Sequence, residues 1–375
     1  MIKKITNLKY IFLSIISIFK LNNELKKSNK TVIFFYFPTR AFNKNIFEII
    51  KNLNKSNKFL FYFGYYRKNY FEFQKRKNSY LINNRLLFLI KGVDIFFTSY
   101  VTDSVPKKSK SIYMHHDIFD TALVKKEDET KTLNKLNNFN YIFTSSKLQN
   151  SFFLKLYKKN SIMQKNKCLD VGYSKLQFNL FEYNKLKQTK KRGIIIFIAL
   201  GPFEQNKTQS FYNKIEEFCS YFSKRIDIEK IIIRPHPLDI FSKYLNYKFK
   251  VIKNKKILID KNKNYIYNFK NSDFLVTDIS GIAYTYSFTT LKPVFFYNDF
   301  NNFNDIDYFK NSKYYYYQNK IGFRFKNLFS FKKKFFVFLK DRKLAKSKQI
   351  LKLRNKIFTN KNPIKKISEI IQELD

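Results

Sequence analysis

The fold of this chain is indicated most clearly by residues 272–297, which read SDFLVTDISGIAYTYSFTTLKPVFFY. Two short apolar runs, FLVT and VFFY, flank a segment long enough for a helix, and this strand–helix–strand order is typical of a mostly parallel sheet. Upstream, RGIIIFIALG (192–201) and KIIIRPHP (230–237) are apolar runs that end at a Gly-Pro turn and at a proline-bounded turn. Because such runs predict buried parallel strands, we expect an α/β domain here.

The first half of the chain shows the same alternation of short apolar runs with polar stretches of helical length. The runs that predict strands there are TVIFFYF (31–37), KFLFYFGYY (58–66), DIFFTSYV (94–101), SIYMHH (111–116) and YIFTSS (141–146). Each of them ends near polar residues. Ligand sites of parallel sheets form beyond the carboxyl ends of the strands, so these polar residues are candidates for a site.

The predicted architecture is α/β, with two Rossmann-like domains that face a central cleft in the manner of a GT-B fold. We expect the first domain at residues 31–185 and the second at residues 190–340, joined by a lysine-rich linker. Residues 1–30 are expected to form an N-terminal helix or a membrane-surface segment, and residues 341–375 to form C-terminal helices. The stretch 299–320 has little regular pattern, so no element is predicted there.

The chain is strongly basic, since 73 Lys and Arg against 28 Asp and Glu give a formal net charge of +45 over 375 residues. Such a charge attracts nucleic acid, acidic lipid headgroups or a phosphate-bearing substrate. The abundance of Asn, Ile, Phe and Tyr beside 7 Gly, 7 Pro and no Trp indicates an AT-rich coding bias, which also accounts for lysines without any specific partner. The charge therefore does not select among these classes.

Cysteine use and the first residues bear on the compartment. Cys168 and Cys219 are too few and too distant for a disulfide framework or a Cys-based zinc site, which favours a reducing, cytoplasmic location. The apolar segment Tyr10–Phe19 follows several lysines but is only about half the length that a bilayer requires. We therefore interpret it as a core helix or as a membrane-surface helix, with no signal-peptide cleavage site after it.

Arg234 and His236 form the first candidate site. Each of the two prolines in RPHP fixes its own backbone and biases the preceding residue toward an extended conformation, so His236 is held rigidly just past a strand. Arg234 lies two residues earlier, on the same side of an extended strand. A guanidinium and an imidazole at that spacing can bind one anionic group.

The second candidate site follows the strand FLVT. Thr277 closes that strand, and Asp278, Ser280 and Gly281 precede the predicted helix. A Ser-Gly pair at a helix start offers a hydroxyl, free backbone N–H groups and the positive end of the helix dipole, which together suit a phosphate. Asp278 could hold a ribose hydroxyl or organise the turn. Ordinary N-capping by Ser280 is an equally good interpretation of the motif.

His115 and His116 form the third candidate site, because they end a predicted strand and precede Asp117. Neighbouring residues of an extended strand point to opposite faces, so only one of the two imidazoles is expected to face the cleft. A histidine beside an aspartate can serve as a general base near neutral pH. The motif lacks the spacing and the cysteine partners of common metal sites, so no metal is expected.

These sites, in this order, resemble the carboxyl-terminal half of the CDP-glycerol:poly(glycerophosphate) glycerophosphotransferases, which make teichoic-acid-like polymers. The resemblance rests on KIIIRPHP and on residues 272–297, with DVGYSKLQ (170–177) similar to the family's Gly-Tyr-Pro segment and IYMHHD (112–117) in the place of its Trp-His-Gly segment. It covers about residues 95–300. This chain departs from the family at Met114, at Ser174 and at Gly281, where the second serine of the family's Asp-x-Ser-Ser motif would stand.

The resemblance implies a GT-B transferase that moves a polyol phosphate from a CDP-alditol donor to a hydroxyl of a lipid-linked or glycan acceptor, without a cofactor or metal. His116 or His115 would be the base, and His236 and Arg234 would neutralise the donor pyrophosphate. Asp278, Ser280, Gly281 and Thr277 would hold the nucleotide phosphates. The expected location is cytoplasmic, peripheral on the inner face of the membrane, with contact to its anionic surface.

Two other functions remain open from the sequence. A GT-B glycosyltransferase or epimerase that uses a UDP-sugar would have the same cleft architecture, because fold likeness does not settle chemistry. A non-enzymatic polyanion binder would account for the net charge, but the basic residues are spread over nearly all segments and no nucleic-acid-binding module stands out. No specific nucleic-acid partner is therefore expected.

Overall fold

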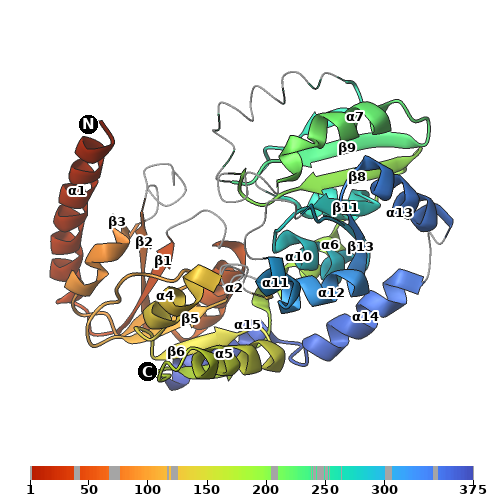
Figure 1. The fold of residues 1–375 in the computed structure, drawn as a ribbon. Coiled ribbons are helices and arrows are strands. Elements are labelled where there is room, and N and C mark those ends of the chain that lie inside the picture. Colours follow the sequence, from red (N-terminus) through yellow and green to blue (C-terminus); the bar gives the residue numbers. More distant parts are fainter. Residues whose placement is uncertain are drawn as a thin grey trace. The chain divides into compact units, whose positions relative to one another are not determined.

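The computed structural model describes residues 2–37, 43–66, 77–115, 118–119, 126–203, 210–237, 239, 242, 249, 252, 254–262, 264–299, 306–340 and 345–374. The chain divides into two compact units (Figure 1). Unit 1 comprises Met1–His116, Glu127–Phe178 and Phe358–Asp375, and unit 2 comprises Asp117–Lys126 and Asn179–Ile357. Each unit is an α/β structure around its own parallel sheet.

Unit 1 contains a seven-stranded parallel sheet in the order β3-β2-β1-β4-β5-β6-β7. Its strands are β1 (Thr31–Phe37), β2 (Phe59–Tyr65), β3 (Ser79–Leu81), β4 (Ile95–Thr98), β5 (Lys110–Met114), β6 (Tyr141–Thr144) and β7 (Lys167–Asp170). Its helical segments are α1 (Ile2–Leu25), α2 (Asn43–Leu53), η2 (Asn54–Ser56), η3 (Asn84–Leu89), α4 (Lys126–Leu136), α5 (Lys147–Lys159) and α15 (Pro363–Glu373). Helix α6 (Ser174–Lys185) carries the chain from unit 1 into unit 2.

Unit 2 contains a six-stranded parallel sheet in the order β10-β9-β8-β11-β12-β13. Its strands are β8 (Ile194–Ala199), β9 (Ile228–Arg234), β10 (Ile257–Ile259), β11 (Phe274–Thr277), β12 (Val294–Tyr297) and β13 (Gly322–Phe325). Its helical segments are η6 (Phe211–Asn213), α7 (Ile215–Ser223), α9 (Ile266–Asn271), α10 (Ile282–Thr290), α11 (Ile306–Lys310), α12 (Lys313–Ile321), α13 (Leu328–Lys340) and α14 (Ala345–Ile357).

Both sheets are doubly wound, as the prediction of Rossmann-like domains requires. In each sheet the first strand along the chain, β1 or β8, occupies an interior position. The next two strands lie on one side of it, and the later strands lie on the other side. The direction of winding therefore reverses between β1 and β4 in unit 1, and between β8 and β11 in unit 2. Ligands of open α/β sheets bind at such reversals, beyond the carboxyl ends of the strands.

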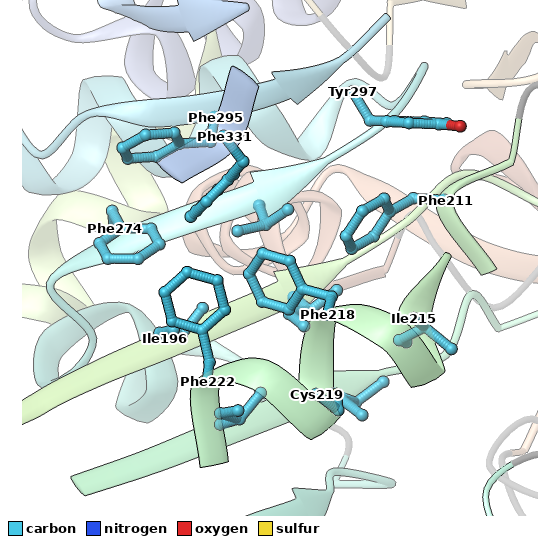
Figure 2. Packing of buried hydrophobic residues seen from close by; sticks show 14 of the residues in the cluster. Ile196, Phe211, Ile215, Phe218, Cys219, Phe222, Phe274, Phe295, Tyr297 and Phe331 are labelled. Atoms are coloured by element: carbon cyan, nitrogen blue, oxygen red, sulfur yellow. The ribbon is translucent and has the colours of Figure 1, made fainter. Parts of the chain in front are cut away.

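Aromatic side chains fill much of the core of unit 2 (Figure 2). Phe218 and Phe222 of α7 meet Phe331 of α13 edge to face, with ring centroids 4.9 and 5.2 Å apart. Phe274 of β11 and Phe295 of β12 pack beside them, at 4.8 Å from each other. Offset and edge-to-face ring pairs add to the free energy gained by burying apolar area, so this cluster holds α7 and α13 on one face of the sheet.

The strand predictions are confirmed, and the region 299–320, for which no element was predicted, contains two helices. Its described part forms α11 and α12, and α12 packs near β12 and β13. The short strands β3, β7, β10 and β13 were not predicted. Within the described residues, every helix is too short or too polar to cross a membrane.

Candidate functional site

The candidate site of unit 2 lies where β8, β9 and β11 end. Gly201 follows β8, His236 follows β9, and Asp278 follows β11. These strands are neighbours in the order β9-β8-β11, and the winding reverses between β8 and β11. His236 and Asp278 therefore follow the strands on either side of β8, at the edge where doubly wound sheets bind their ligands.

The carboxylate of Asp278 ties this region together. It is 1% exposed and accepts hydrogen bonds from the backbone N–H of Gly201 at 2.7 Å, from the backbone N–H of Phe211 at 3.1 Å and from the hydroxyl of Ser210 at 3.3 Å. One side chain thus connects the ends of β8 and β11 with the start of η6. Its role in the structure is to organise the turn, which was one of the two roles expected for it.

Burial makes the ionised form of the Asp278 carboxyl energetically unfavourable. Burial raises the pKa of the carboxyl to about 6, although the backbone donors of Gly201 and Phe211 act in the opposite direction. The group is therefore mainly ionised at pH 7 and gains a proton when the pH falls through about 6.

Tyr314 holds the loop that follows Asp278. Its hydroxyl accepts a hydrogen bond from the N–H of Ser280 at 2.8 Å, and it lies 2.9 Å from the carbonyl oxygen of Ser280 and 3.2 Å from that of Asp278. The hydroxyl of Tyr284 in turn donates to the carbonyl oxygen of Tyr314. Because Tyr314 lies on α12 and Tyr284 on α10, two helices fix the backbone of residues 278–280.

Ser280 and Gly281 precede α10, which begins at Ile282. Gly281 occupies the N-cap position, and no side chain caps the helix. The hydroxyl of Ser280 is partly exposed and makes no hydrogen bond within the described part of the chain. The N-capping interpretation of Ser280 is therefore not seen. The N–H of Ala283 already donates to the carbonyl oxygen of Ser280 at 3.2 Å, so an anion could reach the hydroxyl of Ser280 and the N–H groups that precede Ala283.

Thr277 plays a different part from the one expected. Its side chain is fully buried, and its hydroxyl donates to the carbonyl oxygen of Ala199 at 2.6 Å. The bond joins β11 to the end of β8 inside the sheet. Thr277 therefore supports the switch point and does not present its hydroxyl to a ligand.

His236 is attached to the same network through η6. Its backbone N–H donates to the hydroxyl of Tyr212 at 3.3 Å, and its carbonyl oxygen accepts from the N–H of Asp239 at 2.8 Å. Tyr212 follows Ser210 and Phe211, the residues that bind Asp278. Burial lowers the pKa of the imidazole to about 4, so His236 is uncharged at neutral pH.

Arg234 is held by a buried carboxylate. Its Nη1 lies 2.6 Å from Oδ2 of Asp260, which also accepts from the side-chain amide of Asn268 at 2.6 Å. The guanidinium carbon lies 5.6 Å from the ring centroid of Tyr265. The negative charge of Asp260 thus balances the positive charge of Arg234. Because His236 is uncharged at pH 7, Arg234, Asp260 and His236 together carry no net charge, and the expected pair of cations is not formed.

The histidines of unit 1 differ in what the structure shows. His115 is 4% exposed, and its ring lies 5.2 Å from the ring of Tyr113 and 4.9 Å from the ring of Phe153. This aromatic, buried position fits a core histidine and not a general base. His116 lies outside the described residues. Three positions further along the chain, Phe119 packs in unit 2 on Tyr284 at 4.5 Å.

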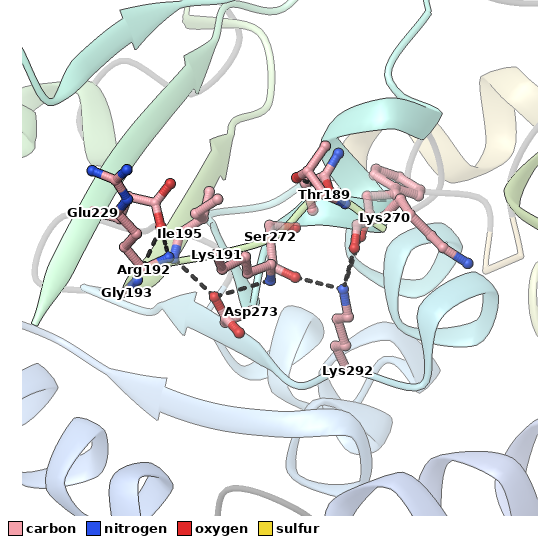
Figure 3. A network of polar contacts seen from close by, with 12 residues as sticks. Thr189, Lys191, Arg192, Gly193, Ile195, Glu229, Lys270, Ser272, Asp273 and Lys292 are labelled. Carbon is pink, nitrogen blue, oxygen red and sulfur yellow. Dashed lines mark hydrogen bonds and ion pairs between the residues drawn. The ribbon is translucent and has the colours of Figure 1, made fainter. Parts of the chain in front are cut away.

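The Lys-Pro pair before β12 acts at the amino-terminal end of the sheet, opposite to the site (Figure 3). The Nζ of Lys292 donates to the carbonyl oxygens of Phe269, Lys270 and Ser272 at 3.2, 2.8 and 2.5 Å. It therefore caps the carboxyl end of α9, whose last carbonyl groups have no partner in the helix. Burial lowers the pKa of Lys292 to about 7.

The sequence did not reveal the residues that hold the site in place. These are Gly201, Ser210, Tyr212, Asp260 and Tyr314. The Gly-Pro turn after the first strand of unit 2 was a signal for Gly201, but Tyr212 and Tyr314 stand among many other aromatic residues. In the described ranges, no group of three or more His, Cys, Asp or Glu side chains is arranged to hold a metal ion.

Comparison with solved structures finds proteins of the same fold. The wall teichoic acid polymerase TagF, as a variant soaked with CDPG, has a TM-score of 0.64 at 13% identity, covering 100% of this chain and 95% of that chain. UDP-GlcNAc 2-epimerase from Methanocaldococcus jannaschii, in complex with UDP-GlcNAc and UDP, has a TM-score of 0.61 at 16% identity, covering 92% and 99%. A putative UDP-N-acetylglucosamine 2-epimerase from Listeria monocytogenes has a TM-score of 0.61 at 10% identity, covering 93% and 98%.

These comparisons confirm the predicted fold class, and the likeness to TagF agrees with the resemblance seen in the sequence. The chain is an α/β protein of the GT-B type, with two Rossmann-like units. No family model matches the chain, and no curated protein matches its sequence.

Proposed function

We propose that this protein is a transferase that moves a polyol phosphate from a CDP-activated donor to a hydroxyl of a surface-polymer precursor. One observation carries the proposal: a hydrogen-bonded network joins Asp278 and His236 beside the switch point, and the hydroxyl of Ser280, at the amino end of α10, bonds to none of the described residues. A free hydroxyl with helix N–H groups at that position suits a diphosphate. The fold shared with TagF is in agreement with this choice of donor.

In this proposal the donor phosphates are bound by the hydroxyl of Ser280 and by the N–H groups of Gly281 and Ile282, at the amino end of α10. Asp278 does not touch the donor but shapes the loop. His236 is neutral, so it contributes a hydrogen bond, and the charge of the donor is stabilised mainly by the helix N-terminus. Arg234 acts through Asp260 and stabilises the region beyond β9.

The chemical step exchanges one bond to phosphorus for another. The acceptor oxygen forms a bond to the β-phosphorus of the CDP-alditol, while the bond from that phosphorus to the bridging oxygen breaks. CMP leaves, and the polyol phosphate remains attached to the acceptor as a diester. His116 takes the proton of the acceptor hydroxyl, since His115 is buried among aromatic rings. No cofactor or metal enters this step.

The test is release of CMP by the purified protein from CDP-glycerol or CDP-ribitol in the presence of a lipid-linked or glycan acceptor. His236→Ala should slow release about 10- to 100-fold, the usual effect of one lost hydrogen bond, while thermal unfolding stays near that of the wild type. Ser280→Ala should raise the KM for the donor, whereas Ser220→Ala, at an exposed position of α7, should change neither parameter. Wild-type turnover in a folded His236→Ala protein would contradict the proposed role.

A second candidate function is a glycosyltransferase or epimerase that uses a UDP-sugar. The observation in its favour is the shared fold with the UDP-GlcNAc 2-epimerases. The same phosphate loop would serve either donor, so the products must decide. Release of UDP, or epimerisation of UDP-GlcNAc, with no CMP formed from CDP-alditols would select this alternative.

A further inference from the structure

The outer face of α1 presents a row of large apolar side chains to solvent. Leu8, Phe12, Ile16 and Phe19 are 66%, 64%, 50% and 68% exposed. Their spacing of four, four and three residues places them along one side of a helix. The row extends for about 16 Å, because a helix rises about 1.5 Å per residue.

The opposite face of α1 is fixed to unit 1. Ile18, Leu21 and Leu25 are buried on that face. The hydroxyl of Ser14 accepts from the N–H of Asn83 at 3.1 Å, and the side-chain amide of Asn22 donates to the carbonyl oxygen of Leu89 at 3.0 Å. Figure 1 shows α1 beside β3, near the edge of the sheet of unit 1. The apolar row therefore belongs to a folded surface and not to a loose tail.

Basic side chains accompany this apolar row. Lys20, Lys26, Lys27 and Lys91 are exposed, and none of them makes an ion pair within the described part of the chain. Lys91 lies at α1 because its backbone N–H donates to the side chain of Asn22 at 2.9 Å. The acidic residue of α1, Glu24, is engaged by the hydroxyl of Tyr80.

We propose that this face of α1 binds the surface of an anionic lipid bilayer. Helices that lie in the membrane interface bury an apolar row among the acyl chains and keep basic side chains at the headgroups. The exposed lysines near α1 complement acidic headgroups. The proposal does not depend on the donor or the reaction proposed for unit 2.

The other occupants fit this surface less well. Nucleic acid would satisfy the lysines but would leave Leu8, Phe12, Ile16 and Phe19 in contact with water or phosphates. A second copy of the chain would cover the row but would bring the same lysines together without a matching acidic patch, because the whole chain carries +45.

The test uses flotation of the full chain with vesicles of phosphatidylcholine and with vesicles that also contain roughly one-third phosphatidylglycerol. The wild type should float with the anionic vesicles and much less with the neutral ones. Phe12→Ser combined with Phe19→Ser should reduce the bound fraction about tenfold or more, since two large apolar side chains no longer enter the bilayer. The matched control is Leu154→Ser combined with Phe181→Ser, which removes two exposed apolar side chains elsewhere and should not change binding.

Two outcomes would overturn the proposal. One is equal flotation of the Phe12/Phe19 variant and the wild type, with circular dichroism showing that both are folded. The other is absence of flotation together with a wild-type dimer in sedimentation velocity that the Phe12/Phe19 variant loses, because the row would then be an interface between copies. CMP release in solution by the same variant should match the wild type, which separates a failure of this proposal from a failure of the proposed function.

Discussion

The hydroxyl groups of two buried tyrosines position the two loops of the candidate site. Tyr212 accepts from the N–H of His236, and Tyr314 accepts from the N–H of Ser280. Neither side chain is expected to meet a substrate, since both are buried. The residues that were predicted to carry the chemistry are thus held by residues that were not predicted.

Tyr314→Phe tests this positioning role directly. The change keeps the ring in the core but leaves the N–H of Ser280 without its acceptor, which should cost about 1–2 kcal/mol in the free energy of unfolding. If the loop binds phosphates, the KM for the donor should also rise while kcat changes less. Chemical denaturation and CMP release measure the two effects. Tyr316→Phe, at an exposed position of the same helix, is the control; a lower stability with an unchanged KM would leave Tyr314 a purely structural residue.

Asp278→Asn should change the dependence of stability on pH. The folded-state pKa of about 6 lies above the ordinary aspartate value of 3.8, so between about pH 4 and 6 the folded protein holds a proton that the unfolded chain has released. This stabilisation is complete at low pH and is lost as the pH rises through about 6. The free energy of unfolding changes by roughly 3 kcal/mol over this range of pH.

The measurement is the difference in the free energy of unfolding between wild type and Asp278→Asn at several pH values. The asparagine does not titrate, so the wild type should lose stability relative to the variant between about pH 4 and 6. Asp307→Asn, an exposed change in α11, should leave the wild-type profile intact. Parallel profiles of wild type and Asp278→Asn would show that the carboxyl is not perturbed as described.

At the scale of elements, the strands that carry the predicted site residues could be recognised in the sequence, whereas the helix that carries Tyr314 could not. The strands with long buried runs, such as TVIFFYF and RGIIIFIALG, were found because continuous burial is visible in composition. Strands β7 (KCLD) and β13 (GFRF) were missed because they are short and only partly buried. Helix α12 was missed because KYYYYQNK has no clear apolar periodicity, and Tyr314 lies on it.

Strand order explains why the positions of the two motifs could be predicted from the sequence, whereas their hydrogen-bond partners could not. Once RPHP and DISG were placed after parallel strands of the same sheet, their common position at one edge of that sheet followed from topology. The contacts of Tyr314 with Ser280 and of Arg234 with Asp260 span 34 and 26 residues. Such long-range pairs depend on how helices and loops dock on the sheet, which local patterns do not specify.

Gly322→Ala should disrupt the link between α12 and the sheet. A Cβ at this position would lie 1.7 Å from the carbonyl oxygen of Val294, so β13 cannot keep its pairing with β12. The expected loss is about 3 kcal/mol or more in stability, the usual result of a forced backbone shift. Lys320→Ala, two residues away and exposed, is the control for thermal unfolding. A melting temperature for Gly322→Ala equal to that of Lys320→Ala would contradict the pairing.

At the scale of the whole molecule, the chain returns to its first unit at the end. Helix α14 belongs to unit 2, and the following helix α15 belongs to unit 1, where Ile367 and Ile371 enter the core that contains β1, β4 and β5. Gly172 has a φ of +85° and lies close to Asn360 and Pro363. A Cβ added to Gly172 would lie 3.0 Å from the Cβ atoms of both residues. The prediction from the sequence grouped residues 341–375 as C-terminal helices, because no local pattern distinguishes α14 from α15.

Ile367→Ala and Ile350→Ala form a matched pair that tests this division. Both side chains are fully buried, on α15 and α14 respectively, so each substitution should cost about 2–5 kcal/mol in the unit that it belongs to. Hydrogen exchange measured by mass spectrometry should show faster exchange in β1 and β4 for Ile367→Ala, and in α10 and α12, the helices on which α14 packs, for Ile350→Ala. Since α15 packs on α2 of unit 1, the effect of Ile367→Ala should extend into α2 as well. Faster exchange confined to unit 2 in both variants would mean that α15 does not stabilise unit 1.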